Sequence, residues 1–331
     1  MLGDLGRIGC WVFVCFLMGC GKDQDGFGNV GLSGDAVGMD GALADIGSGG
    51  SVDSGSIGPA DCGEVGGAAL DGSVEVGGQQ ACPSDMVLIE GDYCPFLEQP
   101  CMHNVKGGVK RCARFGRSRC VGKTYRRRFC IDRYEYPNIE GMKPAVMVSW
   151  YDAVYACEVE GKRLCLASEW TLACEGVERS PYPYGFVRDS TVCNFDRERI
   201  VPEPRLVLFS QPRSVGAEVA RLDMRVASGE QEGCVSSFGV RDMTGNVDEW
   251  VINEDYFSDK PEKTGYAFLS GLKGGYWGPI RAACRPMTTA HEETFRFYQI
   301  GFRCCASTSL EPDGVYEQYA VRMKRWFDRV R

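Results

Sequence analysis

The chain has 331 residues, of which 44% are apolar and 25% are charged, the proportions of an ordinary globular protein. This length allows one large domain or two average ones. The formal net charge of −8 argues against nucleic acid as a partner, because phosphate backbones attract basic surfaces.

The N-terminal twenty residues have the pattern of an export signal. Arg7 precedes an apolar run, residues 8–18, that is too short to span a bilayer as a stable helix. The run ends in Leu-Met-Gly-Cys, which resembles a bacterial lipobox with Cys20 as the lipidated residue. We therefore predict a signal peptide at residues 1–19 and a lipid on Cys20 that anchors the protein to a membrane. The expected location is the cell envelope, periplasmic or surface-exposed, and the outer membrane in a Gram-negative cell. A plain secretory signal is the alternative.

Residues 20–80 differ in composition from the rest of the chain. Residues 21–80 hold 18 glycines, ten acidic residues and one lysine, which leaves this segment at −9. Such a sequence cannot bury enough apolar surface to offset the entropy lost on ordering. We predict a flexible stalk between the lipid and a folded domain that begins near residue 81.

Cysteine usage also indicates export. Apart from Cys10, Cys15 and Cys20, fifteen cysteines remain, which implies an oxidising compartment and a disulfide framework. Because fifteen is odd, at least one is free or pairs between chains, and Cys62 in the stalk is the best candidate. A zinc cluster is the competing interpretation, but the chain has no C-x-x-C pair and only two histidines.

The folded part is expected to open with an apolar strand at residues 86–89 and a turn at Glu90-Gly91. Residues 92–128 hold four cysteines and many basic residues, which predicts a disulfide-stapled insertion with little regular structure. Its charge suits an anionic polymer, although such runs are also typical of a solvated loop.

Strands are then expected at residues 129–136 and 146–150, from alternating and continuous apolar patterns respectively. A helix is expected over residues 151–161, with Gly161 as its stop.

Two further helices are expected. One begins at Ser168 as its N-cap and ends near Gly176. The other, within residues 309–331, has apolar side chains at steps of three and four and a basic opposite face. We expect this terminal helix to pack on the domain. A helix that binds a membrane surface or a partner is the alternative.

Four motifs carry a family resemblance. They are Val148-Ser149-Trp150, Gly245-Asn246-Val247-Asp248-Glu249-Trp250, Lys273-Gly274-Gly275-Tyr276-Trp277 and Ile300-Gly301-Phe302-Arg303-Cys304. In this order and spacing they resemble the sulfatase-modifying-factor family, whose founding member is the formylglycine-generating enzyme. The resemblance implies a C-type-lectin-like α+β fold of the formylglycine-generating-enzyme type over residues 81–308, rich in loops and stapled by disulfides.

The resemblance implies one disulfide, between Cys157 and Cys304. The family partner of the position matched by Cys174 lies where this chain has Thr289. Cys174 therefore pairs elsewhere, and the sequence alone leaves its partner open.

The resemblance also implies an incomplete catalytic site. The family's enzyme binds copper(I) with two cysteines five residues apart, because thiolates and copper(I) are both soft. Here Pro279 replaces the first cysteine and only Cys284 remains. We therefore expect neither copper binding nor formylglycine generation, and whether the chain is an enzyme stays open. Cys284 is either a buried or disulfide-bonded structural residue or a reactive thiolate.

A structural Ca²⁺ site is a further implication of the resemblance. The ligands carried over are the carboxylates of Asp242 and Glu249 and the backbone oxygens of Gly245 and Val247. Hard oxygen ligands suit this hard cation. The alternative is that the two carboxylates cap turns and pair with arginines. A second calcium site would begin at Asn194, with Phe195 beside it, and its other ligands cannot be placed.

Three functional hypotheses remain. The first is a membrane-tethered binding or interaction module that presents a groove to a peptide or glycan. The groove would be lined by Tyr276, Trp277, Arg281 and Tyr298, which fit a packed core nearly as well. The second is an oxidoreductase that uses Cys284 or a metal. An iron site would have to use His291-Glu292-Glu293, which lacks a third ligand and is better interpreted as a polar loop. The third is a purely structural surface protein.

Overall fold

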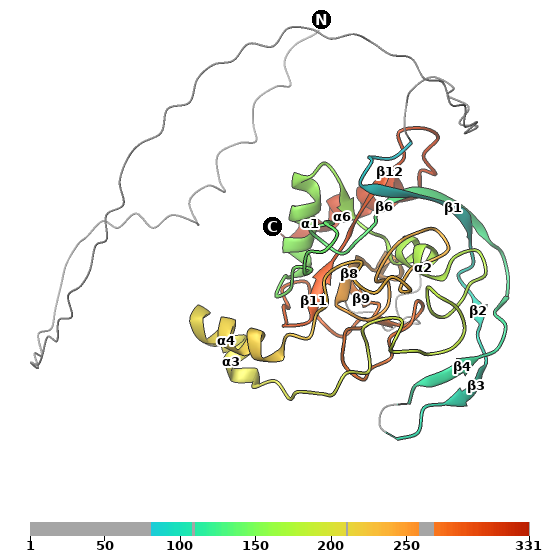
Figure 1. Ribbon diagram of the computed structural model, residues 1–331. Coiled ribbons are helices and arrows are strands. Elements are labelled where there is room, and N and C mark those ends of the chain that lie inside the picture. The colour runs from blue at the N-terminus through green and yellow to red at the C-terminus, as the bar shows by residue number, and fades with distance from the viewer. Residues whose placement is uncertain (1–80, 108–109, 210, 258–267, 331) are drawn as a thin grey trace, which may run out of the picture. The chain divides into compact units, whose positions relative to one another are not determined.

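The computed structural model describes residues 81–107, 110–209, 211–257 and 268–330 (Figure 1). The predicted signal peptide, the lipidated Cys20 and the stalk with Cys62 lie outside the described residues. These assignments therefore stay predictions.

Two four-stranded sheets form the frame of the described domain. In the first sheet the order is β1 (Met86–Tyr93), β6 (Tyr125–Asp132), β12 (Cys304–Ser307) and β7 (Arg163–Leu164), and all neighbours are antiparallel. In the second the order is β10 (Met287–Thr288), β9 (Ser270–Lys273), β8 (Asp248–Ile252) and β11 (Ile300–Phe302), with β8 and β11 parallel. A single residue, Arg303, separates β11 from β12, so the chain passes there from one sheet to the other.

The helices lie in the connections and at the C-terminal end. They are α1 (Trp150–Val159), α2 (Ala167–Glu175), α3 (Pro204–Phe209), α4 (Pro212–Leu222), the 3-10 helix η1 (Glu254–Phe257) and α6 (Val315–Val330). α3 and α4 form a separate pair, seen at the lower left of Figure 1.

Two larger apolar cores hold the sheets, α1, α2 and α6 together, while α3 and α4 contribute to a smaller one around Trp277. In the first, α2 packs against the first sheet through Trp170 and Leu172. In the second, α1, α6 and the second sheet surround Trp150 and Trp250. Because successive side chains of a strand point to opposite faces, Cys304 belongs to the second core and its neighbour Cys305 to the first. β12 therefore lies between the two cores.

The tryptophans of two sequence motifs tie those motifs together. Trp150 Nε1 donates to the carbonyl of Val251, and Trp250 Nε1 donates to the carbonyl of Val148, each at 3.0 Å. Both indoles are buried, where an unpaired N–H costs about 1–3 kcal/mol. These motif residues therefore serve the fold.

The strands depart from the sequence predictions at three points. The predicted turn at Glu90-Gly91 is wrong, because β1 pairs with β6 over eight consecutive residues and this ladder overrides the local turn preference. The strand expected at residues 129–136 lies four residues earlier, as β6. Residues 146–149 are irregular, because Met147 has φ +62° and interrupts the extended run.

The two central helices lie close to their predicted places. Ser149 caps α1, since its Oγ accepts from the Asp152 N–H at 3.2 Å and the Asp152 carboxylate accepts from the Ser149 N–H at 2.8 Å. Gly161 follows the helix with φ +70°, a conformation that favours glycine. The N-cap of α2 is Leu166, so the prediction of Ser168 is wrong; Ser168 lies in the first turn and donates to Glu254.

The insertion at residues 92–128 is more regular than expected. β2 (Leu97–Glu98) pairs with β5 (Arg119–Cys120), and β3 (Cys101–Asn104) pairs with β4 (Cys112–Phe115). The bridges Cys94–Cys120 and Cys101–Cys112 close these short loops, which lowers the entropy of the unfolded chain.

α6 covers the second core with its apolar face. The residues that pack there are Val315, Tyr316, Tyr319, Met323, Trp326 and Phe327. Trp326 Nε1 also donates to the hydroxyl of Tyr256 at 3.1 Å. The terminal helix thus packs on the domain. Within the ranges described, no helix is both long and apolar enough to cross a membrane.

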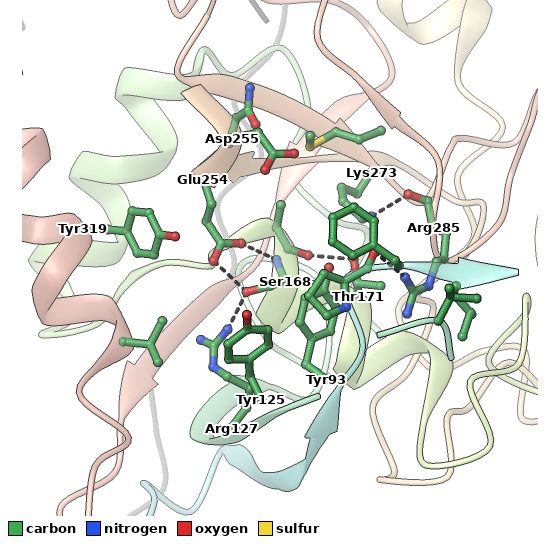
Figure 2. Close-up of a pocket in the computed structure, with 18 of the residues that line it drawn as sticks. Tyr93, Tyr125, Arg127, Ser168, Thr171, Glu254, Asp255, Lys273, Arg285 and Tyr319 are labelled. Carbon is green, nitrogen blue, oxygen red and sulfur yellow. Dashed lines mark hydrogen bonds between the residues drawn. The ribbon is translucent and has the colours of Figure 1, made fainter. Parts of the chain in front are cut away.

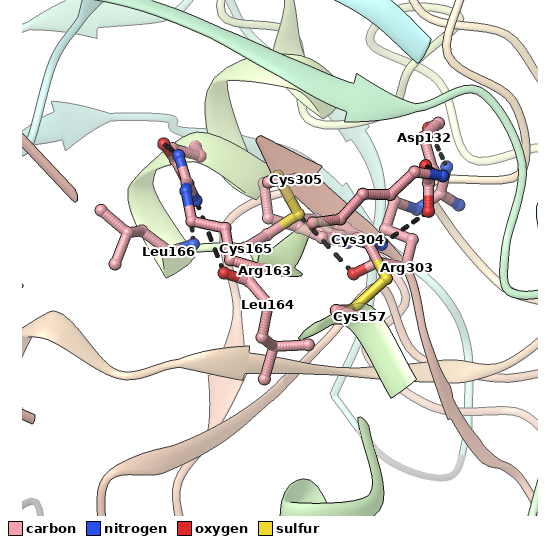
Figure 3. Close-up of a disulfide and its surroundings, with 12 residues drawn as sticks. Asp132, Cys157, Arg163, Leu164, Cys165, Leu166, Arg303, Cys304 and Cys305 are labelled. Carbon is pink, nitrogen blue, oxygen red and sulfur yellow. Dashed lines mark hydrogen bonds and ion pairs between the residues drawn. A yellow bond between two sulfur atoms is a disulfide. The ribbon is translucent and has the colours of Figure 1, made fainter. Parts of the chain in front are cut away.

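All fourteen cysteines of the described residues form disulfides. The pairs are Cys82–Cys130, Cys94–Cys120, Cys101–Cys112, Cys157–Cys304, Cys165–Cys305, Cys174–Cys284 and Cys193–Cys234. The Cys157–Cys304 bridge implied by the family resemblance is among them. Figure 3 shows it beside Cys165–Cys305, where neighbouring residues of β12 are fastened to two different segments.

Candidate functional site

Cys284 is not a free thiol. It forms a disulfide with Cys174 of α2, and both residues are fully buried in the first core. A bridged sulfur is neither a thiolate nucleophile nor a copper(I) ligand. The catalytic role considered for Cys284 is therefore wrong, and the open question of the Cys174 partner has the same answer.

The aromatic groove expected at Tyr276, Trp277 and Tyr298 is a packed cluster. Trp277 and Tyr298 are 3% and 5% exposed, and the three ring centroids lie 5.6–6.2 Å apart. Arg281 is exposed beside a small cavity that these rings do not line. The groove prediction is wrong because the aromatic side chains fill the space between them.

Glu249 forms a buried ion pair. Arg303 donates to its two carboxylate oxygens through Nε and Nη2, each at 2.7 Å, and Trp170 Nε1 donates to it at 2.7 Å. Neither Glu249 nor Arg303 is more than 1% exposed. The guanidinium also donates to main-chain oxygens, so its hydrogen-bonding capacity is filled.

Two further carboxylates share this centre. Burial and the charges of Asp242 and Glu249 raise the pKa of Glu135, and burial raises the pKa of Asp242 to about 6. Asp242 accepts from the Gly229 N–H at 2.7 Å, which is the turn-capping role of the alternative interpretation.

These residues do not fit the Ca²⁺ site implied by the family resemblance. The Glu249 carboxylate is already neutralised by Arg303, and a divalent cation bound to that carboxylate would be repelled by the guanidinium. Across the described ranges, no three acidic, histidine or cysteine side chains are arranged to hold a metal ion.

Asn194 holds two loops together where a second calcium site was expected, and Phe195 beside it is buried in a small apolar cluster. The Asn194 carbonyl accepts from the Asn246 N–H at 2.8 Å, and a Cβ at Gly245 would lie 2.4 Å from that oxygen. Glycine is therefore required by this close approach. The Asn194 side-chain oxygen is also engaged, by Arg197 Nε at 2.9 Å.

The residues of the alternative iron site turn to different partners. His291 stacks on Phe295 with ring centroids 4.1 Å apart. Glu293 accepts from the Leu269 N–H at 2.6 Å, and Glu292 accepts from Thr294. This is the polar loop of the simpler interpretation.

A cavity of about 920 Å³ lies elsewhere, between α2, η1, α6 and strands of both sheets (Figure 2). Its lining combines aromatic side chains with both signs of charge. The aromatic residues are Tyr93, Phe96, Tyr125 and Tyr319, and the charged ones are Glu98, Arg127, Glu254, Asp255, Lys273 and Arg285.

Carboxylates behind the wall hold the two arginines of the cavity. Arg285 donates twice to Glu175, each time at 2.6 Å. Arg127 donates to Asp313 at 2.9 Å and lies 3.2 Å from Glu169. Their charges are thus matched, and they act as rigid parts of the wall.

The η1 wall of the cavity is rich in hydrogen-bond acceptors. Asn253 is fully buried, and its Oδ1 has no partner in the described part of the chain. Glu254 accepts from the N–H and Oγ of Ser168 at 2.6 and 2.8 Å, and burial raises its pKa to about 7. Burial also raises the pKa of Asp255.

Lys273, the last residue of β9, borders the cavity on another side. It is 3% exposed, and its Nζ donates to the Arg285 carbonyl at 3.0 Å and lies 5.3 Å from the centre of the Trp170 ring. Burial, together with the charge of Arg285, lowers its pKa to about 7. Figure 2 shows Lys273 and Arg285 apart from the group formed by Arg127, Ser168 and Glu254.

The family model that matches this chain covers residues 121–308, more than half of its length, and describes a sulfatase-modifying factor enzyme 1-like domain. The chain belongs to this family. The prediction of a loop-rich, disulfide-stapled α+β fold of the formylglycine-generating-enzyme type is thereby confirmed.

Several solved structures are similar to this member of the family. CarF is 17% identical, with 68% of this chain and 98% of CarF covered and a TM-score of 0.41. PvdO from Pseudomonas aeruginosa is 18% identical, with coverages of 66% and 93% and a TM-score of 0.39. Treponema denticola variable protein 1 is 12% identical, with coverages of 67% and 94% and a TM-score of 0.41. No curated protein matches the sequence.

Sequence reasoning missed the residues of the cavity. Lys273 opens the family motif Lys-Gly-Gly-Tyr-Trp, and Glu254 follows shortly after the motif that ends in Glu-Trp. The available signal was a charged residue at or just beyond the end of a buried strand, since Ser270–Lys273 and Asp248–Ile252 are almost wholly buried.

Proposed function

We propose that this member of the sulfatase-modifying-factor family is a binding module and that the cavity between η1 and Lys273 is its ligand site. The acceptor-rich η1 wall carries the proposal, because the carboxylates of Glu254 and Asp255 line the cavity and can accept hydrogen bonds from a ligand. The volume is within the range of about 300–1,000 Å³ that is usual for small-molecule sites. The Cys174–Cys284 bridge supports binding over thiol chemistry.

The lining favours a hydroxylated or amine-bearing ligand such as a glycan. Glu254 and Asp255 offer oxygen acceptors to hydroxyl or amino groups. Tyr125 and Tyr319 add ring surface on which the apolar face of a sugar can pack.

We further propose that the domain works outside the cytoplasm, tethered to a membrane through Cys20 and the stalk of residues 20–80. The lipobox-like Leu-Met-Gly-Cys run supports this location, as do the paired cysteines, since disulfides persist in oxidising compartments. Metabolic labelling with a radioactive fatty acid tests it. We expect label on the wild type and none on Cys20→Ala, and a wild type without label contradicts the anchor.

Binding is tested with glucosamine and N-acetylglucosamine, by thermal shift and then by calorimetry. We expect saturable binding to the wild type. Asp255→Asn weakens it about tenfold, because a hydrogen bond to a charged group contributes about 1.5–3 kcal/mol. Glu198→Gln is the matched control, since it removes the same charge from an exposed position that does not line the cavity.

The same panel should include dipeptides. Saccharide binding that Asp255→Asn weakens and Glu198→Gln does not supports the glycan class. Binding of dipeptides alone moves the proposal to a peptide ligand. Binding of neither, with the wild type folded, contradicts a ligand site in this cavity.

A further inference from the structure

We infer that Lys273 is a covalent capture site, whose amine forms an imine with the aldehyde or ketone group of a ligand in the cavity. This inference rests on the proposed function, because the ligand must first enter the cavity. The amine of Lys273 forms no ion pair within the described residues, so this reaction would not break one.

The surroundings of Lys273 suit a neutral amine better than an ammonium. An ammonium has three protons to donate, whereas Nζ makes one hydrogen bond, to the carbonyl oxygen of Arg285. The face of the Trp170 ring, 5.3 Å away, gives an ammonium a weak attraction that does not replace a counter-ion. No carboxylate of the described residues forms an ion pair with it. A buried charge without a close counter-ion is costly, whereas a neutral amine keeps its lone pair for reaction.

The charged groups around Lys273 come from three directions. Arg285, just before β10, repels a positive charge on Lys273. Glu175 of α2 and Glu254 of η1 attract that charge. Glu175 is already engaged by Arg285 through two hydrogen bonds, which reduces its attraction for the lysine. Burial remains the largest influence and holds the pKa near 7.

At neutral pH a substantial share of Lys273 is therefore unprotonated. An ordinary lysine, with a pKa of about 10.4, is less than about one-thousandth unprotonated at pH 7. Burial that depresses the pKa in this way is a recognised route to an activated lysine.

The proposed step is a condensation. The Nζ lone pair attacks the carbonyl carbon and a C–N bond forms. The nitrogen gives up its two protons, the carbonyl oxygen leaves as water, and a C=N bond remains. No oxidant or reductant is needed, and hydrolysis reverses the step.

Lys162 provides an internal control with the opposite environment. It is also largely buried, but its Nζ lies 2.7 Å from Asp85 and 2.8 Å from Asp132. Although burial lowers its pKa, hydrogen bonds to Asp132 and Asp85 outweigh that effect and raise the pKa above the ordinary value. Lys162 should therefore be inert at neutral pH.

The test treats the wild-type domain with propanal or glyoxylate and sodium cyanoborohydride over a range of pH, followed by peptide mass spectrometry. The hydride reduces each imine to a stable secondary amine. At pH 7 we expect Lys273 to be labelled at least about tenfold faster than the exposed Lys123, with a half-maximal rate near pH 7. Lys162 should stay unlabelled.

Lys273→Arg should lose this label, while Lys162→Arg keeps it. Because the wild type is decisive, the test survives if Lys273→Arg fails to fold. An unlabelled Lys273, or one labelled no faster than Lys123, overturns the inference. Label on Lys273 without saccharide binding contradicts the glycan proposal alone, and saccharide binding without label contradicts imine capture alone.

Discussion

The domain contains two clusters of buried charge that are built in opposite ways. Around Arg303, one fully buried guanidinium is bound by the Glu249 carboxylate and by main-chain oxygens. Around the cavity, Lys273 and Glu254 lie on different sides of an open volume, and neither forms an ion pair with the other.

This difference separates structural charge from charge that can act on a ligand. A complete cluster contributes to the fold as long as both partners are present. Burial perturbs pKa values in both clusters, since those of Glu135 and Asp242 beside Arg303 are also raised. Among these four groups, only Lys273 and Glu254 have perturbed pKa values and also border a cavity that a ligand can enter. The family motif Gly-Asn-Val-Asp-Glu-Trp supplies Glu249 to the Arg303 cluster, and the motif Lys-Gly-Gly supplies Lys273 to the cavity.

The largest effect is expected when the buried ion pair of Arg303 and Glu249 is broken. Arg303→Met leaves Glu249 buried without its partner and should lower the free energy of unfolding by about 3–5 kcal/mol, measured by urea denaturation. Arg119→Met is the matched control, because its ion pair with Glu98 is exposed and should contribute less than about 1 kcal/mol. Equal losses in the two variants would contradict the distinction.

The next effect concerns the bridge beside the cavity. Cys174 and Cys284 each precede one partner of the Glu175–Arg285 ion pair, so the disulfide and the ion pair fasten the same two segments. Replacing both cysteines by alanine should cost about 2–4 kcal/mol in the free energy of unfolding. Alkylation of the native wild type before digestion should leave Cys284 unmodified, and ready alkylation at neutral pH would restore the thiol hypothesis.

A smaller effect appears in the pH dependence of stability. The folded-state pKa of Glu254 is raised to about 7, so its stabilising contribution is complete below pH 4.5 and is lost as pH rises to 7. Glu254→Gln should remove this decline, which amounts to at most about 1.4 kcal/mol per pH unit. Urea denaturation at several pH values measures it. Glu198→Gln should keep the wild-type slope, and a wild-type slope in Glu254→Gln would show that Glu254 titrates normally.

The smallest effect is expected from metal removal. Because Arg303 already neutralises Glu249, EDTA should leave the melting temperature of the wild type unchanged, and added Ca²⁺ should not raise it. Differential scanning calorimetry checks both. A clear rise with Ca²⁺ that Asp242→Asn abolishes would support the calcium site after all.

The sequence predicted what short motifs and periodicity encode. The helix predicted over residues 151–161, the terminal helix and the Cys157–Cys304 bridge follow from local pattern or from the family resemblance, although α1 begins one residue earlier, at Trp150, where a strand was expected to end. The turn at Glu90-Gly91 failed because sheet pairing with a strand far along the chain decided the conformation.

The candidate site depended on contacts that no local pattern reveals. Glu249 looked like a metal ligand because its partner, Arg303, is 54 residues away. The groove prediction grouped Trp277 with Tyr298 correctly, since their rings do contact, but burial made the group a core. The cavity was invisible because its walls come from segments spread between Tyr93 and Tyr319.

The two neighbouring cysteines of β12 fix the register of this strand covalently. Cys304 is joined to Cys157 on one face and Cys305 to Cys165 on the other. A slip of one residue would turn every side chain of β12 to the wrong core and would put Arg303 or Ala306 where one of the two sulfurs belongs, so the two bridges could not both form. If the cysteines were oxidised before β12 paired with its neighbours, the bridges Cys157–Cys305 and Cys165–Cys304 could form instead and would hold the strand with its two faces exchanged. The native disulfides therefore require that β12 is placed in the sheet before its cysteines are oxidised.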